Sequence, residues 1–152
     1  MRLIKIIIPC LLLNACLLGT SKNAKFYAIS AVPTQVVSEQ YKASIGINRV
    51  QLPKYMDRPQ IVTQRKNSTQ VNISEFNRWV EGPAVLSTRA LAENLSTLLP
   101  AAQINQTRFK GGDFSRTVTV EIVEMNGVLG QKAEITVWYT VQDKAGKIIQ
   151  KK

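Results

Sequence analysis

Residues 117–125, with the sequence TVTVEIVEM, and residues 133–142, with the sequence AEITVWYTVQ, form the most regular pattern in the chain. Apolar side chains recur at every second position in both stretches, which is typical of a strand with one face on a core. The recurring positions are Val118, Val120, Ile122, Ile135, Val137, Tyr139 and Val141. Between the stretches, Asn126-Gly127 and Gly130 supply turn residues. The pattern predicts two long strands joined by a turn.

Shorter strands are predicted on both sides of this pair. Apolar or alternating runs cover residues 26–29, 43–52, 61–63, 71–73 and 147–150. The polar residues 66–70 favour a turn between the third and fourth of these runs. A sheet built from short pieces is expected.

One amphipathic helix is predicted between Glu81-Gly82-Pro83 and Pro100, because proline is favoured in the first turn of a helix and excluded from its interior. At 100° per residue the apolar side chains fall within an arc of about 140°. That arc holds Ala84, Val85, Leu91, Ala92, Leu95, Leu98 and Leu99, and the other side holds Arg89, Glu93, Ser96 and Thr97. The predicted fold class is α+β: a single compact domain with a mostly antiparallel or mixed sheet and one amphipathic helix packed on one face.

The composition suits one domain and disfavours most enzymes. The chain has 152 residues, of which 45% are hydrophobic, and it contains no histidine, so triads that need a histidine base and histidine zinc sites are excluded. Glu81 and Glu93 lie about 120° apart around the helix and do not face each other. Gly111-Gly112 lacks the setting of a phosphate-binding loop and predicts a turn. We expect no catalytic residues, no metal site and no cofactor.

The N-terminus has the features of a bacterial lipoprotein signal. Arg2 and Lys5 precede a short apolar run at residues 6–13, which is too short to span a bilayer as a helix. The run ends in Leu13-Asn14-Ala15-Cys16, which resembles the lipoprotein box, where cleavage leaves a diacylated cysteine as the first residue. An ordinary signal peptide and an uncleaved anchor are the alternatives, and Cys10 is a poorer acceptor because Pro9 precedes it. The expected organisation is a signal at 1–15, a lipidated tether at 16–25 and a domain at 26–152.

The charge of the chain is explained by this location. The formal net charge is +10, which by itself would suit nucleic acid or an anionic membrane. An exported chain does not meet nucleic acid, and the basic residues are scattered rather than arranged in a stripe. Leu17 follows the cysteine, where Gram-negative lipoproteins retained at the inner membrane carry Asp, so the resemblance predicts the outer membrane, facing the periplasm.

Residues 53–59 form a loop bracketed by Pro53 and Pro59. Asp57-Arg58 within it could form a recognition surface, or the pair could stitch its own loop through an Asx-type bond or an ion pair. Trp79, just before the helix, favours a core position over an interface.

Several segments together resemble one family, the ABC-type transport auxiliary lipoproteins, which includes lipoproteins similar to paraquat-inducible protein C. The most specific segment is Tyr55-Met56-Asp57-Arg58-Pro59-Gln60. It is followed by Phe76-Asn77-Arg78-Trp79-Val80-Glu81 and by Leu91-Ala92-Glu93-Asn94-Leu95, and Phe26-Tyr27 precedes it. The resemblance spans about residues 16–142.

The resemblance implies a lipoprotein that partners a periplasm-spanning protein with mammalian-cell-entry (MCE) domains and its inner-membrane transporter, in a system that moves lipid between membranes. The segment from Pro53 to Gln60 presents a charged pair and an aromatic residue in one restricted loop, so Tyr55, Asp57, Arg58 and Gln60 are the partner-binding residues we predict. The alternative function is a lipoprotein that itself binds a lipid or another apolar ligand in the periplasm, and a homo-oligomer is also left open. Family members usually continue with a further strand and a closing helix, so a core incomplete on one face is expected.

Overall fold

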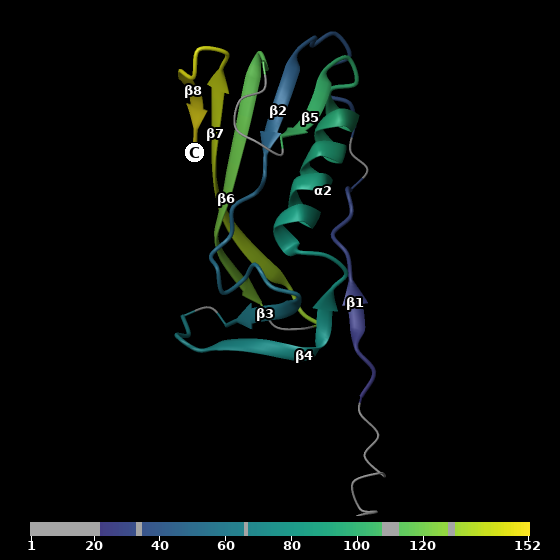
Figure 1. Cartoon of the computed structure of the whole chain (residues 1–152), viewed down its shortest axis with the longest axis vertical. Coiled ribbons are helices and arrows are strands. Elements are labelled where there is room, and N and C mark those ends of the chain that lie inside the picture. Colours follow the sequence, from purple (N-terminus) through teal and green to yellow (C-terminus); the bar gives the residue numbers. More distant parts are fainter. Residues whose placement is uncertain (1–21, 33–34, 66, 108–112, 128–129) are drawn as a thin grey trace, which may run out of the picture.

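The computed structural model describes residues 22–32, 35–65, 67–107, 113–127 and 130–152. The two long strands predicted from the sequence are both present. They are β6 (Arg116–Gly127) and β7 (Ala133–Asp143), and they pair antiparallel along their whole length. Val120 lies opposite Tyr139 and Ile122 opposite Val137, so the alternating apolar side chains share a face as predicted. The register shifts between Ile122 and Glu124, which bends the hairpin toward a second sheet (Figure 1).

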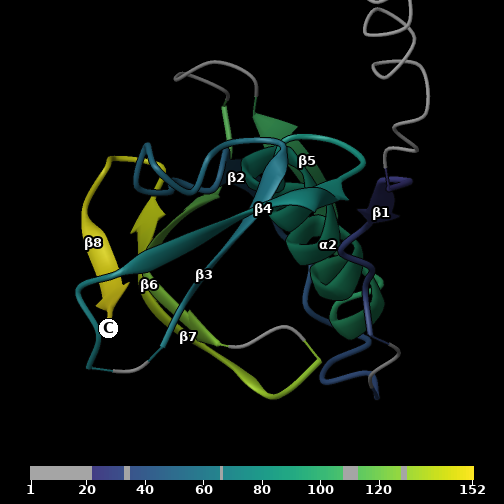
Figure 2. The same ribbon diagram turned by 90° about the horizontal axis from the view of Figure 1, so that it is seen from below.

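The strands form two mixed sheets. The larger has the order β5-β2-β6-β7-β8, with β2 (Ser44–Asn48) parallel to both neighbours and β8 (Ile148–Lys151) antiparallel to β7. The smaller has the order β1-β4-β3 and contains β1 (Lys25–Tyr27), β3 (Gln60–Gln64) and β4 (Val71–Trp79). Seen from below, β3 and β4 lie across the lower end of the molecule, near the far half of the β6–β7 hairpin (Figure 2). The predicted α+β class with a mixed sheet is confirmed.

Two elements differ from the sequence prediction. The strand expected at residues 71–73 extends to Trp79, because its second half pairs with β1, which the local pattern does not reveal. Residues 103–107 form the unpredicted strand β5 (Gln103–Thr107), which contains one apolar residue among four polar ones and pairs with β2. Both strands owe their conformation to a neighbouring strand rather than to their own composition.

The predicted helix is α2 (Pro83–Leu98), with Pro83 in its first turn and Leu99 as its C-cap. It packs on one face of the larger sheet, where Ala92 meets Ile45 and Ile47 in the buried core. Leu91, Leu95, Leu99, Ile104 and Val118 pack around this cluster. Arg89, Glu93, Ser96 and Thr97 are exposed, as the periodicity predicted.

The helix is also buried on a second flank, which the predicted arc missed. Leu86 is 1% exposed and Ala90 is 7% exposed, and both lie at four-residue spacing with Asn94. Asn94 Oδ1 accepts a hydrogen bond from the backbone N–H of Val32 at 3.1 Å. The chain that follows β1 therefore runs alongside this flank, as both views show (Figures 1 and 2).

The face of the larger sheet opposite α2 contains one close contact. Phe114 lies over Gly46 so closely that a Cβ placed on Gly46 would stand 2.3 Å from the Phe114 ring. Only glycine fits beneath this ring without a shift of the ring itself. The contact holds the start of β6 against the centre of β2.

Several large apolar side chains on β7 and β8 are exposed in this chain: Ile135, Val137, Trp138, Ile148 and Ile149. Residues 1–15, where a signal is predicted, and Cys16 lie outside the described residues, as does Gly111-Gly112. Within the described ranges, no helix is long and apolar enough to span a membrane.

Candidate partner-binding surface

The proline-bracketed loop is a compact turn anchored by one buried side chain. The carbonyl oxygen of Pro53 accepts hydrogen bonds from the backbone N–H groups of Met56 at 2.8 Å and of Asp57 at 3.2 Å. Met56 is 5% exposed, whereas Tyr55 beside it is 40% exposed. The turn therefore buries its methionine and presents its tyrosine to solvent.

Asp57 is held by groups outside its own loop. Its Oδ2 lies 3.2 Å from Nη2 of Arg49, and its other carboxylate oxygen faces Gly82, the N-cap residue of α2. A carboxylate is stabilised at this end of a helix because the unpaired N–H groups carry partial positive charge. The sequence left open a recognition surface or a pair that stitches its own loop. The ion pair that would stitch the loop, between Asp57 and Arg58, is not among the described contacts, and the Asp57 carboxylate pairs with Arg49 instead.

The backbone N–H of Arg58 donates to the Met56 carbonyl oxygen at 2.8 Å, but its side chain makes no hydrogen bond or ion pair with a described residue. Its Nε atom is buried without a hydrogen-bond acceptor among the described residues. Buried polar groups are nearly always paired, so the unpaired Nε is unusual, and the half-buried guanidinium is not tied to a described neighbour. The remaining predicted residue, Gln60, begins β3 and lies opposite Arg78 of β4 in the sheet. The backbone N–H of Trp79 reaches back to the Pro59 carbonyl oxygen at 2.7 Å and fixes the end of the loop.

A cleft of about 540 Å³ adjoins the loop at the N-terminal end of α2. Arg49 belongs to both features, since it lines the cleft and binds Asp57. Within the cleft, Arg89 Nη2 lies 2.7 Å from Glu81 Oε2. Because Asp57 and Glu81 neutralise one arginine each, the cleft is polar without a strong net charge. Neither Arg49 nor Arg89 could be predicted as a site residue, because no local sequence pattern indicates that either would reach its acidic partner.

Trp79, Glu81 and Glu93 were the other residues considered from the sequence, and none of them lies in the loop at residues 53–59. Trp79 is half-buried at the end of β4 and lines a small cavity of about 260 Å³ with Tyr27 and Met125. Glu81 is paired with Arg89, and Glu93 lies further along the helix. In the parts of the chain that the structure describes, no cluster of three or more His, Cys, Asp or Glu side chains could hold a metal ion.

Comparison with known proteins identifies the family. A model of the family described as "ABC-type transport auxiliary lipoprotein component" matches residues 27–152. The comparison with curated proteins gives no match.

Two solved structures share the fold. One, described as an uncharacterized protein, is 19% identical with a TM-score of 0.65, over 86% of this chain and 76% of the other. A Xanthomonas campestris protein assigned to the family model DUF330 is 11% identical with a TM-score of 0.68, over 85% of this chain and 74% of the other. The family match runs from the last residue of β1 through β8, and the chain therefore belongs to the family of ABC-type transport auxiliary lipoprotein components.

Proposed function

We propose that this chain is the adaptor lipoprotein of an MCE-type system that moves lipid between membranes. The observation that carries the proposal is the family match over residues 27–152, because the family is one of transport auxiliary lipoproteins rather than of enzymes. Leu13-Asn14-Ala15-Cys16 and the following Leu17 support lipidation at Cys16 and residence in the outer membrane, facing the periplasm. The partners proposed are a periplasm-spanning MCE-domain protein and its inner-membrane transporter.

The loop at residues 53–59 is proposed as the surface that meets the MCE-domain protein. Two prolines and the turn at Pro53 hold its backbone, so little conformational entropy is lost when it binds. Tyr55 is exposed and the half-buried Arg58 side chain is not paired with a described residue, and these two residue types are enriched among the energetically important residues of interfaces.

We expect Tyr55→Ala and Arg58→Ala to remove the crosslink between the lipoprotein and its MCE partner in intact cells, with a loss of about 2 kcal/mol or more of binding free energy. Neither side chain is hydrogen-bonded within the described residues, so the melting temperature of each variant should stay close to that of the natural chain. Crosslinking followed by pull-down, together with thermal unfolding of the purified variants, measures both quantities.

Lys54→Ala serves as the matched control, because Lys54 is exposed in the same turn and should leave the crosslink intact. Full recovery of the partner by both test variants, with stability unchanged, would place the binding surface elsewhere. A parallel fall of crosslinking and melting temperature would mean that the loop acts only in folding.

The alternative function, binding of a lipid by the domain itself, is supported by one feature. A groove of about 470 Å³ lies beside the C-terminal end of α2, and apolar side chains line it together with Ser38 and Arg116. The apolar residues are Val37, Tyr41, Ile45, Leu95, Leu99, Val118, Val141 and Ile149. Arg116 is half-buried there and could pair with an anionic headgroup while an acyl chain contacts the apolar wall.

If the groove holds lipid, purified protein should release non-covalently bound lipid into organic solvent, and Arg116→Ala should lower the yield. Mass spectrometry of the extract distinguishes this lipid from acyl chains attached at Cys16, which stay with the protein. Lipid-free protein that still crosslinks to its partner would exclude the alternative and leave the adaptor role standing.

A further inference from the structure

The strand β5 is an open edge of the larger sheet. It pairs with β2 alone, and the N–H of Gln103 donates to the Ala43 carbonyl oxygen at 2.8 Å. In a parallel pair, alternate residues direct both backbone groups to the neighbouring strand. Gln103, Asn105 and Thr107 therefore bond with β2, and Ile104 and Gln106 direct their N–H and C=O groups away from the sheet.

No described residue bonds with the outward backbone groups of Ile104 and Gln106. Natural proteins protect open edges with lysine, proline or a bulge. β8, at the opposite edge of the same sheet, contains Lys151 and is flanked by Lys147 and Lys152. β5 itself carries no charge, contains no proline and keeps a continuous register with β2, and its one basic neighbour in sequence, Arg108, follows its last residue.

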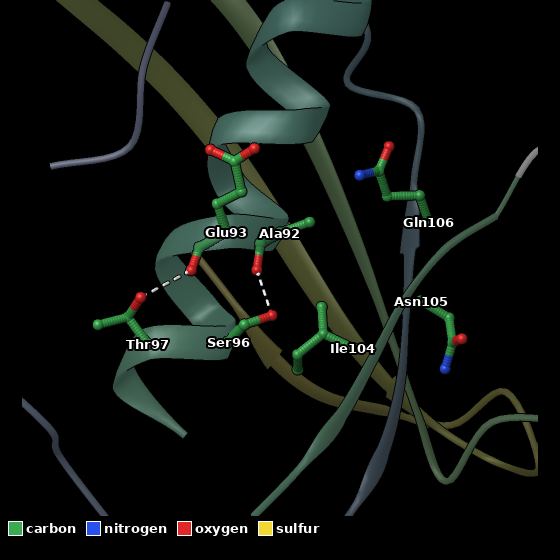
Figure 3. Close-up of a pocket in the computed structure, with 7 residues that line it drawn as sticks. All are labelled: Ala92, Glu93, Ser96, Thr97, Ile104, Asn105 and Gln106. Atoms are coloured by element: carbon green, nitrogen blue, oxygen red, sulfur yellow. Dashed lines mark hydrogen bonds between the residues drawn. The ribbon is translucent and has the colours of Figure 1, made fainter. Parts of the chain in front are cut away.

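A groove of about 680 Å³ follows the open edge between β5 and α2 (Figure 3). Its floor includes Ile104, whose side chain lies toward Ala92 and Ser96 of the helix in the close-up. The two hydroxyl groups on its helix wall already donate hydrogen bonds within the helix. Ser96 donates to the Ala92 carbonyl oxygen at 2.9 Å, and Thr97 donates to the Glu93 carbonyl oxygen at 3.1 Å. A strand beside β5 could therefore place an alternate side chain against Ile104.

Glu93 gives the groove its charge. It lines the groove and is exposed, and its carboxylate makes no ion pair or hydrogen bond with a described residue. Among the described residues that line the groove, Glu93 is the one that carries a charge. An acidic wall beside an uncharged strand edge favours a basic side chain in whatever binds there.

We propose that an extended segment of a protein partner, carrying a lysine or arginine, adds to β5 as a further strand of the sheet. Its backbone pairs with the outward groups of Ile104 and Gln106, and its basic side chain meets Glu93. This mode of recognition takes affinity from main-chain hydrogen bonds and specificity from alternate side chains. The surface is distinct from the loop at residues 53–59, so the inference holds whether or not that loop binds the MCE partner.

The test uses the full chain and a random decapeptide library as the probe. Selected peptides should be basic and alternating, and they should protect the Ile104 and Gln106 amides from hydrogen exchange. Gln106→Pro removes an outward N–H and no hydrogen bond to β2, because residue 106 does not donate to β2, and it should weaken binding of these peptides about tenfold. Gln106→Ala keeps the N–H and should change affinity by less than about twofold.

A second variant keeps the test independent of the proline. Glu93→Lys changes an exposed helix position and should weaken the selected basic peptides about threefold or more. Continued protection of the Asn105 amide in each variant would show that the β2–β5 pairing is intact. The proposal is overturned if no peptide is selected, or if the selected peptides bind the Gln106→Pro variant as well as the natural chain. It is also overturned if the amides of Ile104 and Gln106 are protected only by concentration-dependent dimerisation, because the occupant is then a second copy.

Discussion

Cys16→Ser is expected to abolish incorporation of a fatty-acid label and to leave the signal at residues 1–15 attached to the chain. The reason is chemical: the lipid is carried on the cysteine sulfur, and signal cleavage at a lipoprotein box follows acylation. Each buried CH₂ contributes about 0.8 kcal/mol to membrane binding, and one acyl chain alone holds a protein only marginally. Losing the diacyl group should therefore remove stable anchoring as a whole. Metabolic labelling and intact-mass measurement report the two effects.

Cys10→Ser is the matched control, since it alters the only other cysteine of the chain. It should leave both label and cleavage unchanged. Label that persists in Cys16→Ser and disappears in Cys10→Ser would reverse the assignment. Label that is absent from the natural chain would favour an ordinary signal peptide or an uncleaved anchor.

Leu86→Ala is expected to lower the free energy of unfolding by about 2–5 kcal/mol. Leu86 is 1% exposed, so truncation removes apolar contacts and leaves a cavity between α2 and the segment after β1. Because that segment is tied to the helix at Asn94 and to β4 through the hydrogen bond from the Val80 N–H to the Tyr27 carbonyl oxygen, it has limited freedom to collapse into the space. Equilibrium denaturation with urea measures the change.

Leu86→Met keeps the side-chain volume and should cost less than about 1.5 kcal/mol. Equal losses for the two variants would indicate a specific shape requirement rather than a cavity. A loss below about 1 kcal/mol for Leu86→Ala would show that the flank repacks freely, and the account of the second buried flank of α2 would then be wrong.

The candidate site was only partly predictable. The prolines around residues 53–59 predicted a restricted loop. Tyr55, Asp57, Arg58 and Gln60 were predicted to bind a partner because this loop presents them. Their contacts could not be predicted, because Asp57 had a neighbour of opposite charge at Arg58 and in the folded chain binds Arg49 instead. The Arg58 side chain is then left without a partner among the described residues.

The sequence by itself determined the β6–β7 hairpin, the limits of α2 and the α+β class, because these depend on short-range periodicity and on where proline can stand. Only the tertiary structure decided the length of β4, the existence of β5 and the burial of Leu86. Residues 103–107 carry one apolar side chain, and residues 74–79 have no strict alternation. The local sequence pattern therefore predicts a strand in neither segment. They become strands because they hydrogen-bond with the backbone of β2 and of β1. Such pairing between distant segments cannot be read from the local order of side chains.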